Sequence, residues 1–150
     1  MSITGGNELS DSIAPVPRQL PELEPETAFF WQSGADGCLR ILRCSQCGRY
    51  QHPPWPRCPA CGSEDVAPAV VSGKGLVKTY TVNVQPWVAG LEAPFVFAAV
   101  ELDEQPELYV FSNILAPPDA VRSGMRVEVT FEQREDVYLP LFKPMDSPND

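Results

Sequence analysis

Histidine is scarce in this sequence, and His52 is the only one among its 150 residues. Ser–His–Asp and Cys–His arrangements need an imidazole as their general base. Any such site would have to use His52, which lies in a proline-rich stretch far in sequence from a candidate nucleophile. We therefore expect no catalytic residue, and a binding or supporting role rather than an independent enzyme.

Basic residues are also few: 11 Lys and Arg face 20 Asp and Glu, giving a formal net charge of −9. Proteins that bind nucleic acid neutralise phosphates with clustered cations. The acidic balance counts against nucleic acid as a partner. A single-stranded nucleic-acid-binding zinc-ribbon/OB protein therefore remains only as the alternative function.

Long hydrophobic runs are missing, since no stretch approaches the ~20 apolar residues that span a bilayer. We expect no membrane partner. Residues 1–20 lack the basic start and apolar core of a secretory signal. The sequence therefore predicts a cytoplasmic protein, in which thiols stay reduced.

Four of the five cysteines form two C-x2-C pairs, each followed by a glycine: Cys44 with Cys47, and Cys58 with Cys61. Two such knuckles can supply four thiolates to one tetrahedral ion at ~2.3 Å, with no position left open for water or substrate. The spacing predicts a structural Zn²⁺ site with these four ligands.

Two alternatives to this ligand set and metal remain open from the residues alone. Tetrahedral sulfur also suits iron, and Tyr50 beside the first knuckle is compatible with a rubredoxin-like redox site. His52 is near enough to be considered as a ligand, although we expect it to lie beside the site as a surface or hydrogen-bonding residue. Cys38 is left unpaired, and we expect a buried, unreactive thiol.

The order of sequence patterns predicts a mainly β chain with a short N-terminal helix, a rubredoxin-like zinc ribbon and a five-stranded OB-fold barrel. Period-two apolar patterns recur at 76–84, 95–102, 108–115 and 126–131, with a shorter one at 138–142. Five short strands in ~70 residues favour a closed barrel over a small sandwich. The expected segments are a flexible arm (1–25), the helix (26–37), the ribbon (38–72), the barrel (73–144) and a tail (145–150).

Three adjacent aromatic residues, Phe29, Phe30 and Trp31, lie in the expected helix, which we place at 26–33. On a helix their rings spread over roughly 200°, so we expect at least one to point away from the core that Phe30 meets. These residues and Trp55, in the proline-stiffened ribbon, are candidates for a partner interface. Packing onto the chain's own barrel is the alternative.

The same residues carry a resemblance to a known family. Phe30-Trp31, the stretch 39–47, Cys58-Pro59-Ala60-Cys61-Gly62, Gly73-Lys74-Gly75 and the stretch 124–129 resemble acyl-CoA-associated zinc-ribbon/OB-fold proteins, formerly a domain of unknown function. The resemblance covers residues 26–144. It implies a structural zinc on Cys44, Cys47, Cys58 and Cys61.

The resemblance also implies a function beside another enzyme. Family members act with thiolase-like enzymes and with steroid side-chain aldolases, so we expect a non-catalytic accessory subunit that forms a hetero-oligomer with such an enzyme acting on acyl-CoA thioesters. Acyl-CoA itself is a candidate ligand. Lys74 and Lys78 could meet its phosphates, and Trp87 and Phe95 could contact its adenine or pantetheine arm.

Overall fold

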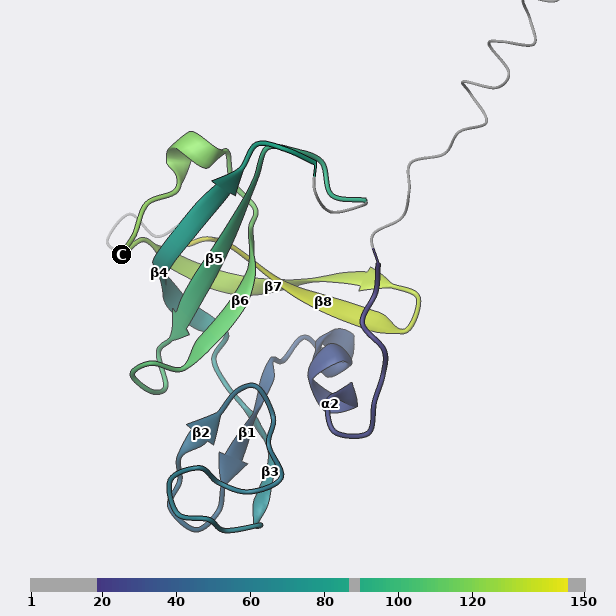
Figure 1. Cartoon of the computed structure of the whole chain (residues 1–150), viewed down its shortest axis with the longest axis vertical. Helices are drawn as coiled ribbons and strands as arrows, with labels where there is room; N and C mark the ends of the chain where they lie inside the picture. The colour runs from purple at the N-terminus through teal and green to yellow at the C-terminus, as the bar shows by residue number, and fades with distance from the viewer. Residues whose placement is uncertain (1–18, 87–89, 146–150) are drawn as a thin grey trace, which may run out of the picture.

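The computed structural model of the protein describes residues 19–86 and 90–145. They form a short helical segment, a three-stranded sheet and a closed five-stranded barrel (Figure 1). The mainly β fold with a ribbon followed by an OB-type barrel is therefore as predicted. None of the helices in the described ranges has the length and hydropathy that a membrane crossing requires.

The helical segment is a single α-helical turn, α2 (Ala28–Trp31), followed by the 3-10 helix η1 (Ser33–Asp36). The expected helix at 26–33 is thus shorter and changes type where Ser33 is buried. The Ser33 hydroxyl donates to the Phe29 carbonyl at 2.9 Å and accepts from the Arg40 N–H at 3.1 Å. One buried side chain therefore ties the helical turn to the first strand.

The ribbon sheet has the order β2-β1-β3, with β1 (Arg40–Cys44) in the centre, β2 (Tyr50–Gln51) and β3 (Val66–Val70). Both neighbours run antiparallel to β1. Strand β3 contains Pro68 opposite Leu42. Proline is tolerated there because β3 is an edge strand.

The barrel closes in the order β4-β5-β6-β8-β7, and β7 returns to pair with β4. Its strands are β4 (Lys74–Asn83), β5 (Phe95–Leu102), β6 (Tyr109–Ile114), β7 (Arg126–Arg134) and β8 (Val137–Pro144). The 3-10 helix η2 (Pro118–Ala120) lies between β6 and β7. This strand order is that of a five-stranded OB barrel.

The β7–β8 hairpin is longer than its apolar pattern indicated. Pairing continues to Arg134 opposite Val137, so only two residues form the turn. The extended hairpin projects beyond the barrel and passes over the helical segment (Figure 1). Phe131 and Tyr138 pack directly onto Gly34, where a Cβ would lie within 2.5–2.7 Å of their atoms.

One apolar core joins the three parts. Phe30 from α2 and Leu39 and Ile41 from the ribbon belong to the same buried cluster as barrel residues such as Val100 and Phe142. Segment 19–27 crosses the outer face of β8, where Leu20 and Leu23 pack on Val137, Leu139 and Leu141. The part of the expected arm within the described residues therefore lies against the barrel; residues 1–18 lie outside them.

Candidate metal centre

The two knuckles repeat one backbone arrangement. In each, the glycine N–H donates to the carbonyl of the first cysteine: Gly48 to Cys44 at 2.9 Å, and Gly62 to Cys58 at 2.8 Å. Both glycines have left-handed backbone, with φ of 77° and 79°. This conformation is disfavoured for residues that carry a Cβ, so the glycine after each pair lets the chain turn away.

The arginine that precedes each first cysteine completes the repeat. Arg43 Nε donates to the Gly48 carbonyl at 2.9 Å, and Arg57 Nη1 donates to the Gly62 carbonyl at 3.1 Å. The repeated unit is therefore Arg-Cys-x-x-Cys-Gly, which is visible in the sequence once the arginines are given this function. Because each guanidinium is charged, its hydrogen bond to the glycine carbonyl is charge-assisted and therefore stronger than a neutral one.

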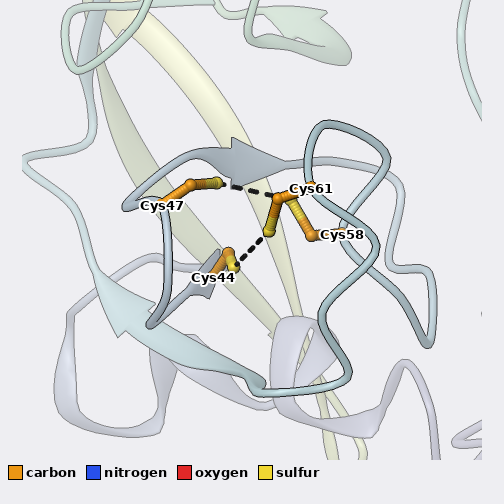
Figure 2. Close-up of side chains that lie close together, drawn as sticks. All are labelled: Cys44, Cys47, Cys58 and Cys61. Carbon is orange, nitrogen blue, oxygen red and sulfur yellow. Dashed lines mark hydrogen bonds between the residues drawn. The ribbon is translucent and has the colours of Figure 1, made fainter.

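The four sulfurs converge from the two knuckles (Figure 2). The Sγ atoms of Cys44 and Cys61 are 3.6 Å apart, those of Cys47 and Cys58 are 3.5 Å apart, and all four lie within 4.8 Å of one another. A tetrahedron with metal–sulfur bonds of ~2.3 Å has sulfur–sulfur edges of about 3.8 Å. The cluster is positioned to bind one metal ion and closes its coordination.

The thiol electrostatics favour a divalent cation at this point. The backbone N–H of Cys61 is the main influence that lowers the pKa of Cys58, to about 7. At Cys61 the N–H of Ser63 lowers the pKa, but the sulfurs of Cys44, Cys47 and Cys58, together with burial, outweigh it and raise the pKa to about 12. Four thiolates this close repel one another, and a bound cation removes that repulsion.

Comparison with known proteins gives matches on both folded parts. Residues 31–67 match the family described as "ChsH2, rubredoxin-like zinc ribbon domain", and residues 69–132 match "ChsH2, C-terminal OB-fold domain". The solved structure "Ltp2-ChsH2(DUF35) aldolase" contains a chain 33% identical to this one. The match has a TM-score of 0.75 and covers 83% of this chain and 98% of that chain.

The chain belongs to the DUF35 family.

Two curated relatives are much longer than this DUF35 protein. A probable enoyl-CoA hydratase alpha subunit from Thermomonospora curvata is 35% identical over 128 residues, which are 85% of this chain and 40% of the relative. The 3-oxo-4,17-pregnadiene-20-carboxyl-CoA hydratase alpha subunit of Mycobacterium tuberculosis is 33% identical over 139 residues, 92% of this chain and 44% of the relative. The chain thus spans less than half the length of each.

His52 lies outside the sulfur cluster and packs against the aromatic helix. Its ring is tilted by 32° over Phe30 at a centroid distance of 4.6 Å, and its Nδ1 is buried without a hydrogen-bond partner. Burial lowers the pKa of His52 to about 4, so the imidazole is neutral at pH 7. It is a packed aromatic residue rather than the surface or hydrogen-bonding residue that the sequence suggested.

Cys38 and the carboxylates that follow β5 make contacts with other residues of the chain. Cys38 is half-buried rather than buried, and its sulfur lies 3.9 Å from the Asp36 carbonyl. Asp103 accepts two bonds from Arg126, at 2.6 and 2.7 Å, and the guanidinium lowers the pKa of Asp103. Glu104 accepts from the Ser72 N–H at 2.7 Å. Asp103 and Glu104, in the turn after β5, are therefore both held by contacts within the chain.

The candidate acyl-CoA residues do not form one cluster. Lys74 begins β4 and Phe95 begins β5, opposite Asn83 at the far end of β4. At the rise of an antiparallel strand this separates Lys74 and Phe95 by roughly 25–30 Å. Lys78 is exposed at the irregularity between Val77 and Thr79. Trp87 lies outside the described residues.

The candidate interface residues are mostly packed inside. Phe30 is buried, Phe29 and Trp31 are half-buried against the same core, and Trp31 meets Phe30 edge-to-face at 4.9 Å. The expectation that at least one ring points away from the core that Phe30 meets is wrong, because Phe29 and Trp31 both pack against that core. Trp55 is the exposed member, at 65%.

Proposed function

We propose that this DUF35 protein is an accessory subunit that binds a structural zinc and supports a thiolase-like or aldolase enzyme acting on acyl-CoA thioesters. The observation that carries the proposal is the match over 98% of the DUF35 chain in the Ltp2-ChsH2 aldolase structure. The two hydratase alpha subunits, one of which is named for a steroid-type acyl-CoA, support the thioester class.

The zinc has a structural role in this proposal. When bound, the ion would take all its ligands from Cys44, Cys47, Cys58 and Cys61, which leaves no open coordination position for a substrate. The chain's own residues then contribute a fixed surface. The ribbon holds His52 against Phe30, and Phe30 extends the barrel core. A reducing cytoplasm suits five free cysteines.

Direct contact with acyl-CoA is the finer part of the proposal. The exposed amines of Lys74 and Lys78 would meet phosphate groups, and Phe95 and Trp87 would meet apolar or aromatic parts of the ligand. Because Lys74 and Phe95 lie at opposite ends of the paired strands β4 and β5, only an extended ligand could touch both. Trp55, which is exposed on the ribbon, is a candidate contact for the enzyme partner.

The test is recovery of the enzyme partner and measurement of its activity. The tagged chain is purified from its native host, the metal is quantified and co-eluting proteins are identified by mass spectrometry. We expect one zinc per chain and a thiolase-like or aldolase protein in fixed ratio, whose carbon–carbon bond cleavage or formation on acyl-CoA falls when this chain is removed. A partner that is fully soluble and active alone would contradict the proposal.

A further inference from the structure

The outer face of strands β4, β5 and β6 carries no charged side chain over three consecutive cross-strand rows. Residues directly opposite in antiparallel strands point to the same side of a sheet. The rows are therefore Thr79 with Ala99 and Phe111, Thr81 with Phe97 and Asn113, and Asn83 with Phe95. We call these eight residues the phenylalanine face. In a chain with 21% charged residues, such a face is set apart from the rest of the surface.

Two large rings stand exposed on this face. Phe97 is 43% exposed and Phe111 is 63% exposed, and their rings stack at a centroid distance of 6.2 Å with an interplanar angle of 15°. By contrast Val96, Ala98 and Val110, which alternate with them along the strands, are at most 1% exposed in the core. Ala99 and Asn113 on the same face are buried, so its exposed apolar surface is concentrated in these two stacked rings. Exposed apolar surface of this kind marks interaction sites.

Phe111 stands between two hollows. One, of about 530 Å³, runs along the phenylalanine face to segment 19–21 and β8. The other, of about 420 Å³, lies toward the ribbon between Thr27, His52 and Tyr109. Phe30 and Trp31 line both hollows. A projecting aromatic flanked by two hollows is suited to interlock with side chains of a second protein.

The charges around these hollows indicate what kind of surface fits. Among the described residues, neither hollow is lined by Lys or Arg. The exposed Glu107 lines the second hollow, and the exposed Glu22 and Glu92 directly follow in sequence Pro21 and Leu91, which line the first. Single-stranded nucleic acid needs a cationic groove beside its stacking rings. A second copy, with a net charge of −9, would set carboxylates against carboxylates.

We propose that the phenylalanine face is the docking surface for the enzyme partner, through an apolar patch on that enzyme bordered by Lys and Arg side chains. This rests on the proposed function, since it locates the surface on which that enzyme binds. Phe111 and Phe97 are the central contacts, Trp31 forms the floor of the hollows, and the carboxylates at the margin select a basic border.

The test measures the affinity of the purified partner enzyme, recovered with the wild-type chain, for variants of this chain. We expect Phe97→Thr/Phe111→Thr to weaken binding by about 100-fold, because buried aromatic anchors carry much of the binding energy. The matched control is Val70→Thr, an apolar residue 55% exposed on the ribbon edge strand β3, with binding unchanged within about twofold. Zinc content and melting temperature are compared for all variants.

A second pair of variants tests the border without altering the face. Glu92→Lys/Glu107→Lys changes two exposed residues, and we expect slower association and a weaker dependence of the association rate on salt. If Phe97→Thr/Phe111→Thr does not fold, Glu92→Lys/Glu107→Lys alone tests whether the enzyme docks on this face.

Several outcomes overturn the inference. Equal binding by wild type and both variant pairs leaves the accessory-subunit function intact and shows that the enzyme docks elsewhere. A wild-type chain that holds no enzyme overturns both. Oligonucleotide binding, or self-association seen by light scattering, that is lost in Phe97→Thr/Phe111→Thr assigns the face to those occupants instead.

Discussion

At the residue scale, Cys58 and Cys38 differ in their burial and in their distance from the sulfur cluster. Cys58 is buried within the sulfur cluster, whereas Cys38 is half-buried outside it. We predict that Cys58→Ser loses zinc and unfolds the ribbon, because metal binding in so small a module supplies ~10 kcal/mol or more of its folding free energy. Metal analysis and amide exchange over 40–70 measure both effects. Cys38→Ser should keep one zinc per chain; loss there would change the ligand set.

His52 gives a pH dependence whose sign follows from its burial. Its pKa is lowered to about 4 in the folded chain, from an ordinary value near 6.5. Between these values the unfolded chain binds the extra proton, so the free energy of unfolding falls as the pH drops and is retained above pH 6.5. We predict that lowering the pH from 7 to 5 costs the wild type about 2 kcal/mol more than His52→Phe.

Denaturant titrations of both proteins at the two pH values measure this difference. Phe keeps a ring against Phe30, and both chains share the same cysteines and carboxylates, so zinc release and acid titration elsewhere cancel in the comparison. Equal losses in the two proteins would mean that His52 is solvated in the folded state.

At the scale of elements, the turn between β5 and β6 holds the ribbon to the barrel. Gln105 accepts the Tyr50 N–H at 2.8 Å through Oε1 and donates to the Tyr50 carbonyl at 3.0 Å through Nε2. Tyr50 lies on β2, an edge strand of the ribbon sheet. The amide side chain therefore satisfies that edge as another strand would.

We predict that Gln105→Ala lowers the free energy of unfolding by about 1–3 kcal/mol, because two backbone groups lose their partner. The Tyr50 amide should then exchange faster with solvent. Gln133→Ala is the matched control, since its side chain makes only an exposed contact with the Glu135 carbonyl. Equal exchange at Tyr50 in the two variants would show that the ribbon is held by its apolar contacts alone.

The elements also show what could be predicted from the sequence. Repeated spacing and period-two alternation were sufficient for the four cysteines and the five barrel strands, since both patterns are local. Strand β3 was missed because Pro68 and two alanines do not resemble a strand; its pairing with β1 decides its conformation. The phenylalanine face and Gln105 depend on strand register and on contacts across 55 residues, which no local pattern contains.

For the whole molecule, the shared core couples the metal to the barrel. Leu39 and Ile41 enter the core beside the ribbon, and Val77 and Val127 enter it from the barrel. We predict that chelating the zinc lowers the melting temperature of the barrel by at least ~5 °C, because ribbon unfolding uncovers barrel side chains. Calorimetry before and after chelation, and after Zn²⁺ is added back, measures the shift. An unchanged barrel transition would make the two parts independent.

The apolar core shared by helical turn, ribbon and barrel also limits how these parts can be exchanged between genes. A recombination event that carried the barrel alone would leave an opening where Phe30, Leu39 and Ile41 complete its interior. One that carried the ribbon alone would leave Tyr50 without Gln105. We therefore expect helical turn, ribbon and barrel to be exchanged only as one unit. A fusion made to another enzyme keeps the unit intact when the junction lies outside residues 19–145.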